Sequence, residues 1–147
     1  MFRGRSTHII DSKGRISIPP RFRDLLVSNG DSRLIVTNSD VCLAAYPYRE
    51  WEEIETKMSQ LSSVDREIRL FKRFFLSGAS ECNLDSQNRI LIPPALREYA
   101  KLEKEVILVG QLKFFEIWEK TAFEAELTKS IDNLPALENK LASLGGL

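Results

Sequence analysis

The sequence predicts an α+β, strand-rich fold built from two copies of one small module. The segment DSKGRISIPP at residues 11–20 returns as DSQNRILIPP at residues 85–94, an offset of 74 residues. A repeat this close predicts two copies of one supersecondary unit. At roughly fifty residues each, the copies are too small to bury a stable core alone, so we expect them to pack on each other as a dimer would.

Each copy begins with two short β-type runs around a polar tip. In the first copy these are residues 7–10 and 15–18, on either side of residues 11–14, a pattern typical of a hairpin. Gly14 and Asn88 occupy equivalent positions, and both residue types tolerate a positive φ. The sequence therefore predicts a hairpin in each copy, with a left-handed residue at the end of its turn.

The remaining elements follow in the same order in both copies. Each Pro-Pro pair ends strand pairing and favours the start of a short helix, at residues 21–27 and 95–100. A second strand pair comes next, at 34–37 with 42–46 and at 106–109 with 114–118. The closing helices carry apolar stripes that we expect to be core, namely Trp51, Ile54, Met58 and Leu61, and Phe123, Leu127 and Ile131.

These patterns divide the chain into a first module (1–60), a connector helix (61–78), a second module (79–128) and a helical tail (129–147). Ser62 and Ser63 suggest the N-cap of the connector, and Gly78 its C-terminal stop. The Phe-rich connector needs burial on one side, either across the core or at a subunit boundary. The amphipathic tail is either an interface helix or a frayed end.

Composition favours a compact protein of the cytoplasm. Of 147 residues, 43% are hydrophobic, no apolar run reaches the roughly 18 residues of a membrane span, and the start lacks the apolar segment of a signal peptide. We expect no membrane association. Cys42 and Cys82 have no paired spacing, so two free, buried thiols are expected rather than a disulfide.

Charge is balanced overall, at 21 positive and 21 negative residues, but it is divided along the chain. Six cations and one acid give residues 1–23 a net charge of +5, which leaves −5 for the rest. Much of the negative charge lies late, at Glu116, Glu119, Glu124, Glu126 and Asp132. A molecule polarised in this way can meet an anion with its basic face.

Catalysis is poorly supported by the sequence. His8 is the only histidine and has no partner spacing that suggests a metal site, so we expect a structural residue. Asp11 and Asp85 could form a carboxylate pair, but each has an arginine four positions later that would hold it ionised. We therefore expect no enzyme, no cofactor and no small-molecule substrate.

The Asp-x-x-x-Arg unit has a structural and a functional interpretation. The Asp can accept backbone N–H bonds in the turn while the Arg pairs with it, which would fix the hairpin. Alternatively, the tip presents the Arg to phosphates or guanine. Nearby cations in the first copy favour DNA contact: Lys13, Arg3, Arg5, Arg21 and Arg23. Residues 85–104 carry a net charge of only +1, which makes the second copy the weaker candidate for DNA contact.

These residues resemble the MraZ family. The resemblance covers nearly the whole chain, and its marks are MFRG at 1–4, DSKGR at 11–15, Trp51 with Leu61 and Ser62, ASEC at 79–82, DSQNR at 85–89, and KEV at 104–106 with LVGQ at 108–111. It implies two swapped-hairpin modules of the type seen in AbrB-like regulators, forming one compact, barrel-like unit flanked by helices.

The resemblance also implies a function. Family members are sequence-specific DNA-binding regulators, usually repressors, of the bacterial division and cell-wall gene cluster. They bind short direct repeats in a promoter as closed homo-oligomeric rings, and we expect nucleoid association. The family motif falls on Asp11 with Arg15 and on Asp85 with Arg89. The alternative is an antitoxin-like module that holds a partner protein; an enzyme comes third.

Overall fold

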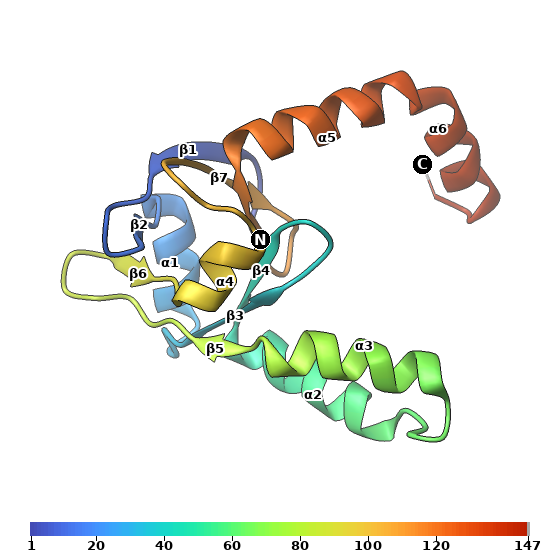
Figure 1. Cartoon of the computed structure of the whole chain (residues 1–147), viewed down its shortest axis with the longest axis horizontal. Coiled ribbons are helices and arrows are strands. Elements are labelled where there is room, and N and C mark those ends of the chain that lie inside the picture. The colour runs from blue at the N-terminus through green and yellow to red at the C-terminus, as the bar shows by residue number, and fades with distance from the viewer. Residues whose placement is uncertain (147) are drawn as a thin grey trace.

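The computed structural model describes residues 1–146, which form an α+β structure of strands and six helices (Figure 1). The first copy comprises β1 (Arg5–Ile9), β2 (Arg15–Ser17), α1 (Pro20–Ser28), β3 (Leu34–Asn38), β4 (Leu43–Pro47) and α2 (Tyr48–Gln60). The second comprises β5 (Ser80–Glu81), β6 (Arg89–Leu91), α4 (Pro94–Tyr99), β7 (Glu105–Gly110), β8 (Phe115–Glu119) and α5 (Lys120–Asp132). Helix α3 (Arg66–Ser77) joins them, and α6 (Leu134–Ser143) follows.

The first two strands of each copy do not pair with each other, so the predicted hairpins are wrong beyond their turns. Strand β1 pairs with β7, and β2 pairs with β6, where Ile16 lies opposite Ile90. Each turn is still closed locally, because the amide of Gly14 donates to the carbonyl of Asp11 over 3.0 Å. The strands separate because pairing across copies places Ile16 and Ile90 in the core, where both are fully buried.

The main sheet has the antiparallel order β1-β7-β8-β4-β3-β5. The predicted second hairpins are confirmed as β3–β4 and β7–β8. The sheet also interleaves the copies, since β1 of the first pairs with β7 of the second, and β5 of the second with β3 of the first. Within residues 1–146 the sheet stays open, with β1 and β5 at its edges, so the barrel-like expectation is corrected. The strands β2 and β6 form a separate two-stranded ribbon instead.

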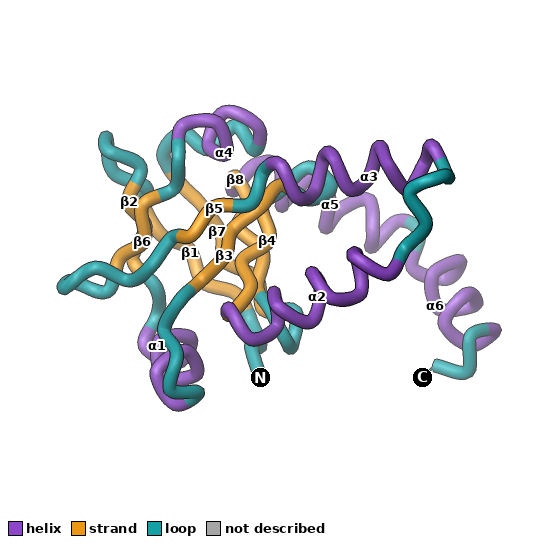
Figure 2. The backbone as a smooth tube through the Cα atoms, turned by 90° about the horizontal axis from the view of Figure 1, so that it is seen from below, coloured by secondary structure: helices purple, strands orange, loops and turns teal. Residues whose placement is uncertain are grey.

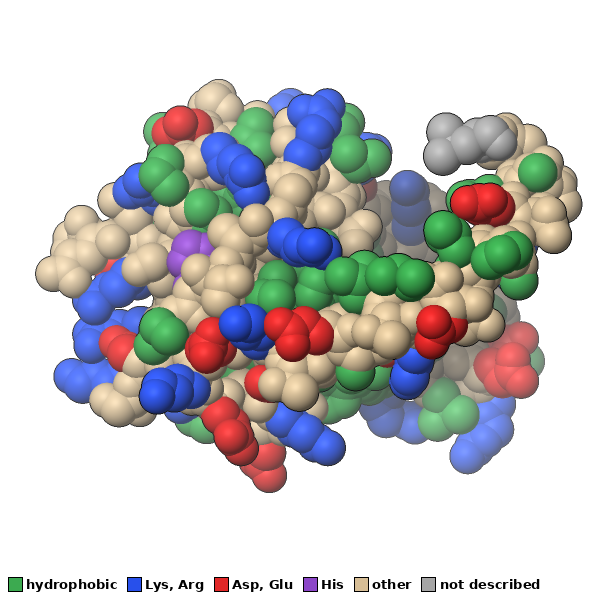
Figure 3. Space-filling view, turned by 90° about the horizontal axis from the view of Figure 1, so that it is seen from above, with side chains coloured by type: hydrophobic (Ala, Val, Ile, Leu, Met, Phe, Trp, Pro, Cys, Tyr) green, Lys and Arg blue, Asp and Glu red, His purple; other side chains and the backbone are tan. Residues whose placement is uncertain are grey.

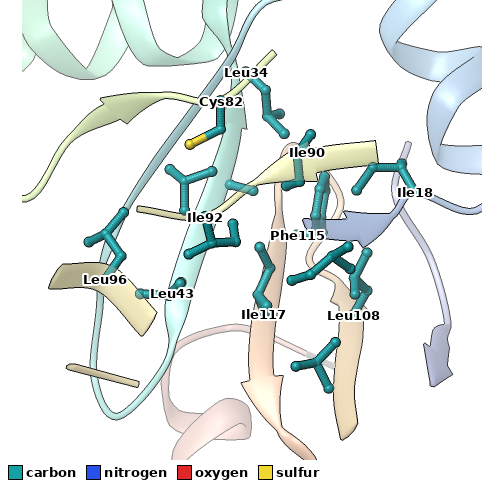
Figure 4. Packing of buried hydrophobic residues seen from close by; sticks show 14 of the residues in the cluster. Ile18, Leu34, Leu43, Cys82, Ile90, Ile92, Leu96, Leu108, Phe115 and Ile117 are labelled. Carbon is teal, nitrogen blue, oxygen red and sulfur yellow. The ribbon is translucent and has the colours of Figure 1, made fainter. Parts of the chain in front are cut away.

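One core is shared by the two copies. Its buried side chains include pairs at the repeat offset, namely Ile16 and Ile90, Ile18 and Ile92, Phe22 and Leu96, and Leu26 and Ala100. Figure 4 shows Ile90 and Ile92 of the second copy packed among residues of the first, such as Leu34 and Leu43. Neither copy therefore has a complete core of its own.

Helices α2 and α3 both extend away from the sheet and approach each other toward the loop that joins them (Figure 2). They cover a second, smaller cluster of Ile35, Trp51 and Phe75. Asp65 caps α3, because its Oδ1 accepts the amides of Glu67 and Ile68; the prediction of Ser62 or Ser63 as the cap is wrong. Gly78 ends α3 as predicted, but its φ of −81° is one that any residue adopts. Glycine is needed here for its small size, because Asn38 lies close to it. A Cβ there would lie 1.5 Å from the Asn38 Oδ1 atom.

The closing helix α5 corrects another expectation. None of its residues is buried, and the stripe predicted as core ends in Ile131, which is 62% exposed. Phe123 packs against Trp118 at the start of α5, and beyond that the helix extends past the sheet toward α6 (Figure 1). Leu61 also falls outside its predicted stripe, as the exposed residue after α2. Among residues 1–146, no helix is long and apolar enough to cross a membrane.

Candidate nucleic-acid interface

The two Asp-x-x-x-Arg turns project from one end of the molecule. Turn 1 (residues 11–14) precedes β2 and turn 2 (residues 85–88) precedes β6, and both lie at the end opposite to α3 and α6 (Figure 1, Figure 2). In the space-filling view, Lys and Arg side chains gather at this end, whereas hydrophobic side chains follow α5 toward α6 (Figure 3). The molecule therefore has a cationic end and a helical end.

The two turns have the same internal geometry. The Oδ1 atom of Asp11 accepts the amides of Lys13 and Arg15 over 3.0 and 2.8 Å, and Asp85 accepts those of Gln87 and Arg89 in the same way. Gly14 and Asn88 have φ values of +91° and +60°, so the predicted left-handed positions are confirmed. Each aspartate thus fixes its turn by bonding the backbone on both sides of the tip.

Each arginine uses only part of its guanidinium group to hold the turn. The Arg15 Nε donates to Asp11 Oδ2 over 2.6 Å, and the Arg89 Nε to Asp85 Oδ2 over 3.0 Å. No other side-chain hydrogen bond of Arg15 or Arg89 occurs within the described residues, so the terminal nitrogens stay available. The two side chains keep 30% and 25% of their surface exposed. The structural interpretation of this unit is therefore confirmed, and its geometry leaves a bidentate fork for a ligand.

The turn geometry also determines the protonation of both aspartates. The backbone hydrogen bond from Arg15, aided by the other turn amide and the guanidinium, lowers the pKa of Asp11 from 3.8 to about 2. The backbone hydrogen bond from Arg89 is the main cause that lowers the pKa of Asp85. A carboxyl that donates or shares a proton needs a raised pKa, so this pair has the opposite character.

The structure separates the predicted cations into two groups. Lys13 and Arg15 lie in or next to turn 1. Arg5 lies at the end of β1 that is far from turn 1. At about 3.4 Å per residue, the strand places it about 14 Å from Ile9, the last residue of β1. Its guanidinium is 5.6 Å from the Phe123 ring centre. Arg3 precedes Arg5 and adjoins Gly110, and Arg21 Nη2 donates to the Arg5 carbonyl.

Arg97 of helix α4, in the second copy, is a basic residue beside turn 1 that was not among the site residues predicted from the sequence. Its guanidinium lies directly against the backbone of Gly14. Lys13 and Arg97 line one cavity of about 460 Å³, together with residues that include Glu81, Asn83 and Leu91. The sequence offered one indication of this contact: the first copy has Gly14 where the second copy has Asn88.

The other candidate residues do not form a chemical site. Cys42 and Cys82 are free and buried, as predicted. Burial raises the pKa of the Cys82 thiol to about 11. His8 is half-buried within β1, where its Nε2 lies 2.8 Å from Ser6 Oγ and burial lowers its pKa. Within residues 1–146, no group of three or more potential metal ligands comes together.

Comparison with known proteins agrees with the repeat. The family model described as "MraZ protein, putative antitoxin-like" matches twice in tandem, at residues 1–74 and 75–142. The chain belongs to the MraZ family. Two relatives named transcriptional regulator MraZ are similar over almost their whole length. The one from Syntrophobacter fumaroxidans is 44% identical over 98% of this chain and 96% of its own. The one from Desulforapulum autotrophicum is 47% identical over 99% of each.

A third MraZ relative shows that the similarity extends to other bacteria. The transcriptional regulator MraZ of Citrobacter koseri is 46% identical over 90% of this chain and 88% of its own. The resemblance seen in the sequence is therefore confirmed at the level of the family.

Proposed function

We propose that this protein is a transcriptional regulator that binds duplex DNA through turn 1. The observation that carries this proposal is the Arg15 guanidinium, which is held by its Nε alone beside Lys13. A held but incompletely used fork suits two phosphate oxygens, or the O6 and N7 atoms of guanine. The MraZ relatives carry the name transcriptional regulator, which supports the same function.

The finer parts of the proposal follow from the family resemblance. The regulator acts as a repressor on the division and cell-wall gene cluster and binds short direct repeats in its promoter, in the cytoplasm at the nucleoid. Turn 2 contributes Arg89, whereas Gln87 replaces the lysine of turn 1. The exchange of strands between the copies supports a swapped-hairpin relation to AbrB-like regulators, with modules at 1–60 and 79–128.

Assembly into a closed ring of copies is part of the same proposal. Large apolar side chains are exposed on the helices that leave the core, namely Leu70, Phe71 and Phe74 on α3, Ile131 on α5, and Leu134, Leu137 and Leu141 on α6. A chain that exposes so many apolar side chains needs a partner surface. Because the helices lie opposite to the turns, copies joined through them could present several turns to direct repeats at high effective concentration.

One observation favours an alternative, a module that holds a partner protein. Phe71, Phe74 and Tyr99 line a cavity of about 560 Å³ between α2, α3 and the β3–β4 loop. Exposed aromatic side chains of this kind are enriched at protein interfaces. Purification with one stoichiometric protein partner, and without DNA affinity, would favour this function.

A mobility-shift titration against the protein's own upstream region tests the proposal. Wild type should bind, and Arg15→Ala should lose binding while keeping its thermal unfolding midpoint near that of wild type. Arg33→Ala is the matched control, because Arg33 makes a similar ion pair with Asp31 outside the turns. Binding by Arg15→Ala at wild-type affinity would contradict the proposed role of turn 1.

A further inference from the structure

We propose that Arg97 of the second copy is a DNA phosphate ligand of turn 1, so that the site is built from both copies of one chain. This inference rests on the proposed function and adds a residue that lies outside the Asp-x-x-x-Arg unit. It is carried by the contact of Arg97 with Gly14 and by the different bonding of the counterpart arginine, Arg23, whose Nε has no hydrogen-bond partner among the described residues.

Gly14 allows Arg97 to lie against turn 1. A Cβ added to Gly14 would stand 2.6 Å from Arg97 Nε and 2.7 Å from its Cζ, so any side chain at this position would displace the end of the Arg97 side chain. The contact spans 83 residues of sequence and joins the start of β2 to helix α4. Gly14 therefore permits the close approach of Arg97, and its φ of +91° is a conformation that glycine adopts without strain.

A short chain of hydrogen bonds holds the Arg97 guanidinium in place. Its Nε donates to the Ile92 carbonyl over 2.9 Å, and the Ile92 amide donates to the Gly14 carbonyl over 2.9 Å. The terminal nitrogens of Arg97 have no hydrogen-bond partner among residues 1–146. As in Arg15, the Nε anchors the side chain and leaves the fork free for an anion.

The surroundings of Arg97 suit a phosphate group. Lys13 and Arg97 line the same cavity of about 460 Å³. The acid Glu81 also lines this cavity, and its carboxylate accepts a hydrogen bond from the side-chain amide Nδ2 of Asn83 over 2.7 Å. With Arg15 next to the turn, three cations face two acids, Glu81 and Asp11, around turn 1, and an excess of clustered cations of this kind neutralises DNA phosphates.

The counterpart turn shows why the contact belongs to turn 1. At the repeat offset, Arg23 corresponds to Arg97 and Asn88 to Gly14. An asparagine side chain at the Gly14 position would displace an arginine placed like Arg97, because even a Cβ there would lie 2.6 Å from the Arg97 Nε atom. Consistent with this, the Arg23 Nε is buried without a hydrogen-bond partner among the described residues, whereas the Arg97 Nε is bonded. The change from Gly14 to Asn88 therefore restricts the composite site to turn 1.

The test compares Arg97→Gln with the matched control Arg33→Gln, which removes one cation outside the turns, in DNA titrations at several salt concentrations. Arg97→Gln should weaken binding about tenfold, the size of a lost charge-assisted hydrogen bond. It should also reduce the salt slope by about one for each engaged turn, on specific and non-specific DNA alike. Arg33→Gln should leave the slope unchanged.

Gly14→Asn provides an independent arm, because it keeps every charge and gives turn 1 the residue of turn 2. It should displace Arg97 and weaken binding by a similar factor, and adding Arg97→Gln should then cause little further loss. Wild-type affinity for Arg97→Gln, or a loss of affinity with an unchanged salt slope, would overturn the inference. If wild type itself fails to bind DNA, the proposed function fails instead.

Discussion

Asp11 and Arg15 form a unit with two roles. The carboxylate fixes the backbone of turn 1 by accepting two amides, and it holds the arginine through Nε. The same bonds stabilise the ionised aspartate and leave the terminal guanidinium nitrogens free. Rigid placement of a cation lowers the entropy lost when it meets a phosphate.

The pKa of Asp11 predicts a pH-dependent stability. Because folding lowers this pKa from 3.8 to about 2, the contribution to the free energy of unfolding is fully present above about pH 5 and is lost as the pH falls toward 2. Urea unfolding of wild type and Asp11→Asn should show a stability difference at pH 6 that shrinks between pH 5 and pH 2. A difference that stays constant over this range would contradict the assignment.

The sequence was sufficient for the local features of the site but not for Arg97. The positive φ values of Gly14 and Asn88 and the ion pairs four residues apart depend on neighbouring residues only. The contact of Arg97 with Gly14 depends on how β2 pairs with β6, which no local pattern specifies. Because strand pairing is not specified locally, the predicted hairpins were correct in their turns and wrong in their strand partners.

Helix α5 shows the limit of reading an apolar stripe as core, and α6, expected to be an interface helix or a frayed end, also leaves its stripe exposed. Their periodicity was visible in the sequence, but a stripe does not say whether it packs on its own chain or on another copy. In the single chain, the residues of α6 are exposed. A subunit contact would require amphipathic helices of this kind, whose apolar faces are not covered by their own chain.

Charges on the apolar face of α6 should therefore disrupt assembly. The double variant Leu137→Glu and Leu141→Glu should lower the molar mass measured by light scattering, because a buried charge is costly at an apolar interface. Its circular dichroism should remain that of wild type, since neither residue belongs to the core. Lys140→Glu, on the same helix, is the control. An unchanged mass for the double variant would exclude α6 from the subunit contact.

The two copies behave as one folding unit because they share strands and a core. Ile16 and Ile90 lie opposite each other in the β2–β6 ribbon, and both are fully buried. Removing either side chain leaves the same kind of cavity at the same place. The duplicated sequence predicted this dependence of one copy on the other.

Ile16→Ala and Ile90→Ala should each cost about 2–5 kcal/mol of stability, as is usual for buried Ile-to-Ala changes. Each copy contains one tryptophan, Trp51 in the first and Trp118 in the second. In variants that keep a single tryptophan, denaturant unfolding followed by fluorescence should give one coincident transition for both copies. Two separate midpoints would show that the copies unfold independently.

At the scale of the whole molecule, the cationic end and the helical end have separate roles in the proposed function. In that proposal, the turns at one end meet DNA and the helices at the other end hold copies in an array. Binding strength then depends on how many phosphates are neutralised at once, and log K falls by about 0.9 per phosphate for each tenfold rise in salt.

The most direct test is a salt titration of binding to the protein's own upstream DNA, measured by fluorescence anisotropy for wild type, Arg15→Ala and Arg89→Ala. The account predicts a wild-type affinity that falls by orders of magnitude as salt rises, a near-complete loss of binding for Arg15→Ala, and a smaller loss for Arg89→Ala. Affinity independent of salt, or retained in full by Arg15→Ala, would contradict it.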